Sequence, residues 1–216
     1  MLIACWSVKG GSGTTVVSAA LGLLLSRDAA GGALIVDLAG DVPAALGMAE
    51  PPGAGVTDWL AAADDVEADA LARLEVDAAP GVRVLPRGSV HEPPTARVEA
   101  LAGALQADER PVVADCGVGP GFVAQALAAA ATRSLLVVRP CYLALRRAVA
   151  APIRPSGVVL VEERGRALSR ADVEDVLGVP VRAVVEVDST VARAVDAGLL
   201  AGRLPAELER GLKNAA

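Results

Sequence analysis

A glycine-rich segment, K-G-G-S-G-T-T at residues 9–15, limits the possible folds more than any other part of the chain. It separates an apolar run at residues 2–8 from an Ala-, Val- and Leu-rich run at residues 14–27. The first run is typical of a buried strand and the second of a helix. A glycine loop in this position turns backbone N–H groups toward an anion, and the positive end of the helix dipole lies at the same place. The segment therefore predicts a phosphate-binding strand, loop and helix.

Short apolar runs alternate with longer Ala- and Leu-rich runs along the whole chain. This alternation is typical of βαβ units whose parallel sheet is covered by helices on both faces. We predict a single α/β domain over residues 1–216, with a doubly wound, mostly parallel sheet of about seven strands. Strands are expected at residues 2–8, 33–37, 82–86, 111–115, 134–139, 157–161 and 181–187. Helices are expected at residues 14–27, 56–63, 95–106, 121–131, 143–150, 170–177, 190–197 and 206–212.

Composition narrows the class of protein further. Because 53% of the residues are hydrophobic but only one Phe, one Tyr and two Trp occur, the core must consist of closely packed Ala, Val and Leu. Twenty-six acidic and twenty basic residues give a net charge of -6, which disfavours nucleic acid as a partner. The three cysteines form no C-x-x-C pair, and we find no signal peptide and no apolar stretch of roughly 18 residues. We expect a cytoplasmic protein.

The loop departs from the standard phosphate-binding motif, G-x-x-x-x-G-K-[ST]. Val8 stands where the first glycine belongs and Thr14 where the phosphate-binding lysine belongs, whereas Thr15 keeps the hydroxyl expected to bind Mg²⁺. The residues expected to contact nucleotide are Lys9, Gly10, Gly11, Ser12, Gly13, Thr14 and Thr15. The alternative is that the glycines only make a tight turn and bind nothing. Without the lysine, weaker affinity and slower phosphoryl transfer are expected.

Two aspartates end predicted strands, Asp37 in A-L-I-V-D and Asp115 in V-V-A-D-C-G. Strand-end carboxylates next to a phosphate loop are candidate ligands for Mg²⁺ or its bound water. For each of them the alternative is a solvated carboxylate or one that caps a turn. Asp41 precedes a short helical turn at residues 43–46, and we expect it to cap that turn rather than take part in catalysis.

Taken together, these segments resemble the ParA/MinD family of P-loop NTPases, and the resemblance covers nearly the whole chain. Residues 9–15 are similar to its deviant Walker A box, K-G-G-x-G-K-[ST]-T, whose signature lysine corresponds to Lys9. In that family this lysine contacts the nucleotide of the opposite subunit. Asp37 matches the first aspartate of a D-x-D segment and Asp115 the Walker B position, which implies catalytic or metal roles for Lys9, Asp37 and Asp115. The second aspartate, which orients the attacking water, is replaced by Ala39.

The resemblance implies that ATP and Mg²⁺ bind and that the chain acts as a nucleotide-dependent homodimer. We expect a positioning or scaffold protein with weak or lost hydrolysis that recruits a protein partner. Within the family the chain looks closest to the CpaE/TadZ branch and septum-site proteins, so the partner is expected in pilus-assembly or division machinery. The alternative is an active partitioning ATPase that binds DNA non-specifically.

Other residues invite interpretations that we weigh against simpler ones. His91 and Cys116 are expected to be a solvated loop histidine and a buried thiol, neither of them catalytic. An arginine cluster around residues 139–154 is explained by a solvated surface as well as by an anionic partner. Leu204, Leu208 and Leu212 follow a helical spacing that favours a packed final helix over a membrane-binding one. Ser169 is expected to cap the helix at residues 170–177, with Asp172 as its capping-box partner.

Overall fold

The computed structural model describes residues 1–51, 53–62 and 69–215. Its strands are β1 (Leu2–Ser7), β2 (Ala33–Asp37), β3 (Val76–Ala79), β4 (Val82–Leu85), β5 (Val112–Val118), β6 (Arg133–Val138), β7 (Gly157–Glu162) and β8 (Val181–Glu186). Its helices are α1 (Thr14–Asp28), α2 (Val42–Leu46), α3 (Val56–Ala61), α4 (Val98–Ala107), α5 (Phe122–Ala130), α6 (Tyr142–Val149), α7 (Arg170–Leu177), α8 (Ser189–Asp196) and α9 (Ala206–Leu212). A short 3₁₀ turn, η1, covers Ala72–Leu74.

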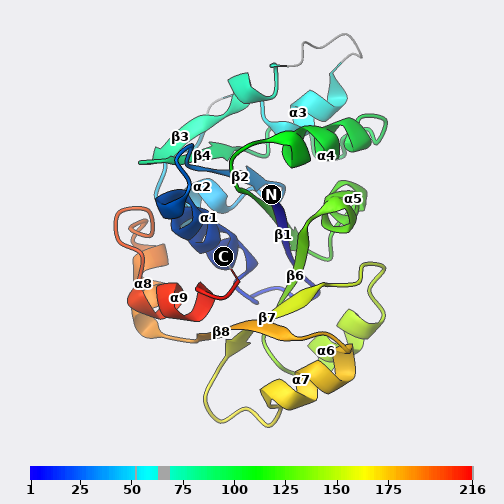
Figure 1. Cartoon of the computed structure of the whole chain (residues 1–216), viewed down its shortest axis with the longest axis vertical. Coiled ribbons are helices and arrows are strands. Elements are labelled where there is room, and N and C mark those ends of the chain that lie inside the picture. Colours follow the sequence, from blue (N-terminus) through cyan, green and yellow to red (C-terminus); the bar gives the residue numbers. More distant parts are fainter. Residues whose placement is uncertain (52, 63–68, 216) are drawn as a thin grey trace.

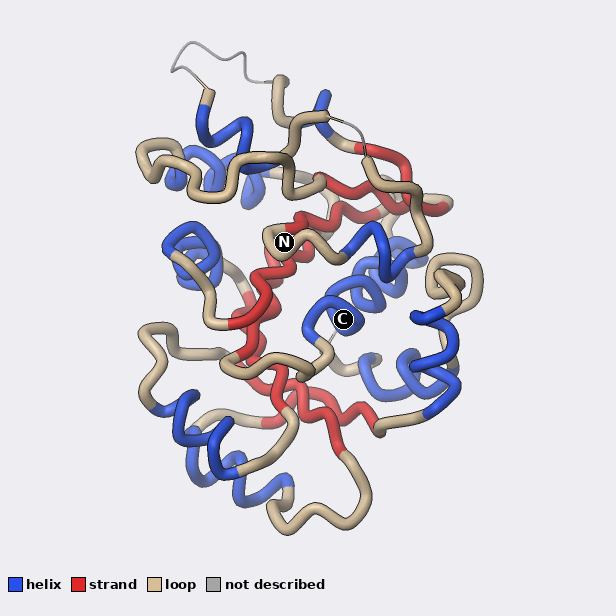
Figure 2. The backbone as a smooth tube through the Cα atoms, turned by 180° about the vertical axis from the view of Figure 1, so that it is seen from behind, coloured by secondary structure: helices blue, strands red, loops and turns tan. Residues whose placement is uncertain are grey.

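The strands form one sheet in the order β3-β4-β2-β5-β1-β6-β7-β8. All neighbouring pairs are parallel except β3 and β4, which are antiparallel. Figure 1 shows the sheet running through the molecule with helices on both sides, and Figure 2 shows the same arrangement from behind. The predicted doubly wound, mostly parallel α/β fold is confirmed, and the described part of the chain has eight strands where about seven were predicted.

The core consists of two apolar layers, one on each face of the sheet. Alternate residues of β1 show how it arises: Leu2, Ala4 and Trp6 join one layer, and Ile3 and Cys5 join the other. The first layer includes residues of α3 to α7, and the second includes residues of α1, α2 and α9. Each strand of the centre is therefore buried on both faces, which explains why its sequence is continuously apolar.

Small residues allow helix α1 to lie close against the sheet. A Cβ built on Gly22 would come within 2.5 Å of the Ile35 side chain, so nothing larger than glycine fits there without a shift. The one large aromatic residue of β1, Trp6, is fully buried, and its Nε1 donates a hydrogen bond of 3.0 Å to Ser134 Oγ. This close packing agrees with a core that depends on Ala, Val and Leu.

Two predictions are confirmed, one about the start of helix α7 and one about the packing of the final helix, α9. Ser169 Oγ accepts a hydrogen bond from the Asp172 amide, and the Asp172 carboxylate accepts one from the Ser169 amide, so the expected capping box is present. Leu208 and Leu212 of α9 are buried and Leu204 is partly buried against the same layer, as expected for a packed final helix. None of the described helices is long and apolar enough to cross a bilayer.

The antiparallel edge strand β3 was not among the predicted strands. Its residues, V-D-A-A, have little strand propensity, and the strand forms because the turn at Pro80 and Gly81 pairs it with β4. Arg83 then bridges to Glu75 and Asp77 at 3.2 and 3.6 Å. The predicted helix at residues 95–106 begins later, at Val98, and part of the predicted helix at residues 56–63 lies outside the described residues.

Candidate functional site

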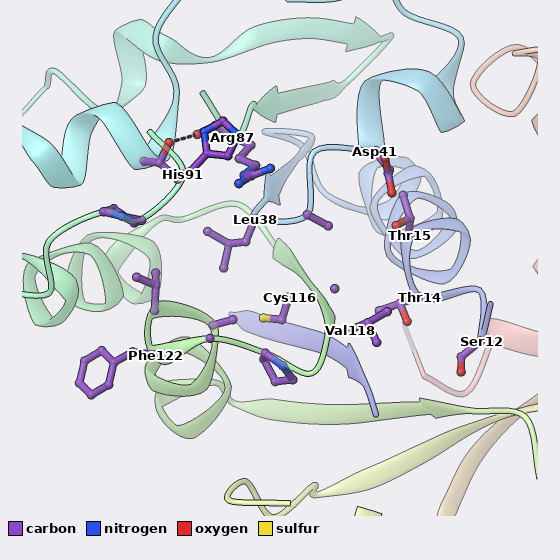
Figure 3. Close-up of a pocket in the computed structure, with 18 of the residues that line it drawn as sticks. Ser12, Thr14, Thr15, Leu38, Asp41, Arg87, His91, Cys116, Val118 and Phe122 are labelled. Carbon is purple, nitrogen blue, oxygen red and sulfur yellow. Dashed lines mark hydrogen bonds between the residues drawn. The ribbon is translucent and has the colours of Figure 1, made fainter. Parts of the chain in front are cut away.

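The candidate site lies at the carboxyl edge of the sheet, where β2, β5 and β1 are adjacent and parallel. In open α/β sheets ligands bind at such an edge. The loops after these strands, together with the segment after β4, enclose a cavity of about 780 Å³ (Figure 3). The cavity is lined by residues 11–16, 38, 39, 41, 57, 87, 91–93, 95, 116–118 and 120–124.

The glycine loop holds an open, hydrogen-bond-poor conformation. Gly11 and Gly13 have φ of 73° and 86°, a left-handed backbone that favours glycine. The Ser12 hydroxyl donates to the Lys9 carbonyl at 2.7 Å and closes the turn from inside. The backbone amides of Gly11, Gly13 and Thr15 donate to no other described residue, and a Cβ built on either glycine would meet no described atom within 4 Å. The loop therefore holds backbone donors without a partner among the described residues, and there is open space beside its glycines.

Thr14 and Thr15 begin α1 and contribute side-chain hydroxyls to the site. Thr14 is 5% exposed, yet its Oγ1 is buried without a hydrogen-bond partner among the described residues. A buried hydroxyl without a partner is costly, and in native structures it calls for a ligand, ion or water. Both threonines line the cavity, and their contact with a nucleotide stays a prediction.

Asp115 is buried at the sheet edge, beside Asp37 on the neighbouring strand. Its Oδ1 accepts a hydrogen bond of 3.2 Å from the Gly117 amide, and its Oδ2 has no partner among the described residues. Burial raises the pKa of this carboxyl to about 6, the Thr15 hydroxyl opposes the rise, and the charge of Asp37 adds to it. Asp115 is therefore not a solvated carboxylate, whereas its hydrogen bond with the Gly117 amide agrees with the other alternative, a carboxylate that caps a turn. Like Asp37 it does not line the cavity, and its metal role stays a prediction.

Asp37 is fully buried and uses both carboxylate oxygens on the backbone of the next loop. Oδ1 accepts from the amides of Ala39 and Gly40 at 3.0 and 2.6 Å, and Oδ2 accepts from Val42 at 3.1 Å. Burial raises the pKa of the Asp37 carboxyl, and the three N–H donors oppose that rise. Asp37 does not line the cavity, so the structure shows it organising the loop, and its metal role stays a prediction.

The prediction that the Asp41 side chain caps the short helix after it is wrong. Asp41 occupies the N-cap position of α2, but its side chain makes no capping hydrogen bond, and the second helical residue, Pro43, has no N–H to donate to it. The first helical amide, Val42, donates to Asp37 instead. The Asp41 carboxylate is exposed and lines the cavity instead, near Thr15 in Figure 3.

Comparisons with known proteins identify the fold. No family model and no curated protein matches the sequence. Among solved structures, septum site-determining protein MinD from Pyrococcus horikoshii OT3, complexed with Mg-ADP, has a TM-score of 0.78 at 22% identity, covering 99% of this chain and 93% of that one. A ParA family ATPase from Chlorobium tepidum TLS gives 0.75 at 18%, covering 97% and 96%. MinD in the MinC:MinD complex of Aquifex aeolicus gives 0.73 at 20%, covering 91% and 85%.

The chain has the ParA/MinD fold. All three likenesses extend over at least 91% of the chain, so the fold includes the glycine loop and the two strands that carry the aspartates. At 18 to 22% identity they establish the fold alone. What the chain binds must be argued from its own residues.

Lys9, the predicted signature lysine, lies at the rim of the ParA/MinD fold's glycine loop and does not line the cavity. Its carbonyl accepts hydrogen bonds from the hydroxyls of Ser12 and Ser7, at 2.7 and 3.4 Å, so its backbone is held while its side chain lies apart from the cavity. Gly10 also lies outside the cavity lining. The contact of Lys9 with a second subunit stays a prediction.

Sequence reasoning missed the part of the site that follows β4. Arg87 and His91 line the cavity opposite the glycine loop, although no motif marks them (Figure 3). Phe122, the first residue of α5, also lines it, from the segment after β5. His91 is exposed, as predicted for a loop histidine, with Nδ1 3.2 Å from the Ser89 carbonyl. Burial raises the pKa of the Cys116 thiol well above its usual value, which keeps it protonated and agrees with a buried, inert thiol.

The described residues offer no ready-made metal cage. No group of three or more His, Cys, Asp or Glu among them is placed to hold a metal ion. Mg²⁺ does not require such a cage, because it is usually bound by one or two carboxylates, waters and substrate phosphates. The hydroxyl of Thr15, which lines the cavity, and the carboxylate of Asp115 next to it are oxygen donors of the kind that Mg²⁺ prefers.

Proposed function

We propose that the chain binds ATP with Mg²⁺ at the glycine loop and acts as a nucleotide-dependent positioning or scaffold protein with weak or lost hydrolysis. The observation that carries this proposal is the loop itself: Gly11, Gly13 and Thr15 line the cavity, and their amides donate to no described residue. Mg-ADP in the structure of the Pyrococcus horikoshii MinD supports the same kind of ligand for the shared fold.

Each group at the site has a role in this proposal. The loop amides and the N-terminus of α1 bind phosphate oxygens, and the buried Thr14 hydroxyl gains the partner that it lacks. Thr15 and Asp115 hold Mg²⁺, whose charge favours the ionised form of Asp115. When bound, Mg-ATP supplies a triphosphate whose negative charge matches these donors.

Weak or lost hydrolysis follows from two side chains. Thr14 offers a neutral hydroxyl where a lysine would stabilise charge on the phosphates. Ala39 presents only a methyl group to the cavity, where an aspartate would orient water. A side chain at residue 117 would crowd this methyl group, since a Cβ built on Gly117 would lie 3.2 Å from the Ala39 Cβ.

Calorimetric titration of the purified chain with ATP, with and without Mg²⁺, tests the proposal. We expect saturable binding that is stronger with Mg²⁺, together with little phosphate release over hours. Absence of binding under both conditions would refute the proposal and leave only the fold. Rapid turnover stimulated by DNA and lost in Asp115→Ala would support the partitioning alternative instead.

Restoring the missing lysine is expected to strengthen binding. In Thr14→Lys the ammonium group extends into the cavity that Thr14 already lines, and a charge-assisted contact with phosphate should raise the affinity for Mg-ATP about tenfold, or about 1.4 kcal/mol. Asn214→Lys adds the same charge beside the opposite, amino-end edge of the sheet and should leave the affinity unchanged. Equal affinities in Thr14→Lys and wild type would argue against phosphates at this loop.

We further propose that the chain forms a homodimer that recruits a protein partner. The resemblance suggests that this partner is a component of pilus-assembly or division machinery. Lys9 lies outside its own cavity lining, as a residue reserved for a second subunit would. The MinC:MinD complex shows that a protein of this fold binds another protein. Light scattering should detect a dimer with Mg-ATP and a monomer without it. Lys9→Ala should bind nucleotide yet stay monomeric, and a nucleotide-independent monomer in wild type would contradict the dimer.

A further inference from the structure

Arg87 lies in the loop after β4, far in sequence from the glycine loop but on the same cavity. We propose that Arg87 supplies the cationic contact to nucleotide phosphate that Thr14 cannot make. This inference rests on the proposed nucleotide binding and names a further residue of the same site. The observations that support it are the place of the side chain, its lack of a partner and the fixed backbone beneath it.

Arg87 is the only lysine or arginine among the described residues that line the cavity. Figure 3 places it on the opposite side of this hollow from Ser12 and Thr14. Its side chain reaches over the loop after β2: a Cβ built on Gly40 would lie 3.4 Å from Arg87 Cδ and 3.7 Å from Nη1. The guanidinium therefore lies beside the loop that carries Ala39 and Asp41.

The Arg87 guanidinium makes no ion pair or hydrogen bond with any described residue, although the residue is partly buried. Two other partly buried arginines are paired: Arg110 with Glu75 and Asp108 at 2.8 and 2.7 Å, and Arg83 with Glu75 at 3.2 Å. Arg139 is partly buried with an unpartnered Nε, but it does not line the cavity. A guanidinium carries five N–H donors in a planar fork that matches phosphate geometry. The unpaired Arg87 guanidinium therefore has N–H donors available for an anion that enters this cavity.

The backbone of Arg87 is held in place from below. Its carbonyl accepts hydrogen bonds from the amide and hydroxyl of Thr57, at 2.9 and 2.8 Å. The Asp58 carboxylate binds the next part of the loop through the amide and hydroxyl of Ser89, at 2.9 and 2.6 Å, and the Gly55 amide at 2.9 Å. Because the backbone is fixed, less ordering is needed when the side chain meets an anion.

The charges on the cavity also favour this role. Its other charged lining residues, Asp41 and Glu92, are acidic and exposed. A triphosphate would meet only backbone donors and hydroxyls from α1, without any side-chain cation from this chain apart from Arg87. The loss of the loop lysine thus coincides with a free arginine on the facing wall.

The test compares Arg87→Met with Arg87→Lys. Methionine keeps an unbranched apolar side chain and removes the charge, whereas lysine keeps the charge and loses the fork. We expect Arg87→Met to weaken Mg-ATP binding about tenfold and to flatten its dependence on salt concentration, and Arg87→Lys to weaken it less. Binding of adenosine, which has no phosphate, should be the same in all variants. Arg203→Met, an exposed arginine away from the cavity, is the matched control.

A rescue experiment separates this role from a structural one. Adding Thr14→Lys to Arg87→Met should recover most of the lost affinity, since one phosphate-binding cation replaces another. If wild type binds no nucleotide, the proposed function and this inference both fail. If wild type binds Mg-ATP and Arg87→Met binds it equally well, only the inference is overturned. Equal melting temperatures of the ligand-free variants should show that the fold is unchanged, and loss of affinity that Thr14→Lys does not restore would also overturn it.

Discussion

Asp37→Ala is expected to lower the free energy of unfolding of the ligand-free protein by about 3 kcal/mol. The carboxylate is fully buried and accepts hydrogen bonds from the amides of Ala39, Gly40 and Val42. Alanine leaves these three donors without a partner, and an unsatisfied buried donor costs about 1–3 kcal/mol. The total is reduced because Ala39 and Gly40 reach water and because burial already disfavours the ionised carboxylate. Denaturant unfolding at pH 7 measures the difference.

Asp41→Ala is the matched control for this experiment, because Asp41 belongs to the same loop. Its carboxylate is exposed and caps nothing, so the substitution should change stability by less than about 0.5 kcal/mol. Asp37→Asn keeps one acceptor oxygen but turns an NH₂ group toward an amide, and we expect an intermediate loss. If Asp37→Ala and Asp41→Ala unfold alike, Asp37 does not hold the loop, and its predicted metal role becomes the better explanation of its position.

The glycine loop and its flanking elements were predictable because their signals are local. The apolar run of β1, the glycines that take positive φ and the Ala-rich α1 all follow one another in sequence. Asp37 ends β2 as predicted, since an apolar run that ends in a carboxylate marks the edge of a buried strand. Asp115 was also singled out from sequence, but the prediction that it ends its strand is wrong, because β5 continues to Val118. The structure then brings Asp37 and Asp115 side by side because β2 and β5 are parallel neighbours.

What the sequence did not reveal depends on contacts between distant segments. Asp41 stands at the usual capping position, but the cap comes from Asp37 four residues earlier, because the strand end points that carboxylate at the loop. The edge strand β3 forms through pairing with β4 rather than through its own propensity. Arg87 follows a strand in a loop with no motif, and only the order of β4, β2 and β5 in the sheet brings it to the cavity.

Asp115→Asn is expected to stabilise the ligand-free protein at pH 8 by about 2 kcal/mol. Burial and the neighbouring Asp37 raise the pKa of the Asp115 carboxyl from 3.8 to about 6, so its ionised form is disfavoured in the folded state. A group whose pKa is higher in the folded than in the unfolded protein stabilises the fold at low pH. That stability is present below about pH 4 and is lost as the pH rises through 6. Asparagine is neutral throughout and avoids the loss.

The pH profile distinguishes this cause from a general effect of removing a negative charge. Wild type should lose stability relative to Asp115→Asn between about pH 4 and pH 7, and the two curves should be parallel above that range. Asp175→Asn removes an exposed carboxylate that has no hydrogen bond or ion pair with described residues, and its curve should follow wild type. A constant difference between Asp115→Asn and wild type across this range would show that Asp115 titrates alike in the folded and unfolded chain.

The same carboxylate links stability to the proposed ligand. Because a bound cation favours the ionised form, Mg-ATP should stabilise wild type more at pH 8 than at pH 5.5, as followed by the shift in melting temperature. In Asp115→Asn the dependence of that shift on Mg²⁺ should be largely lost, while a shift caused by phosphate contacts with the loop remains. In the ligand-free protein, ionising the buried Asp115 carboxyl therefore costs free energy, and a bound cation is expected to reduce that cost. A shift that is independent of pH in wild type would contradict direct contact between Asp115 and the cation or its water.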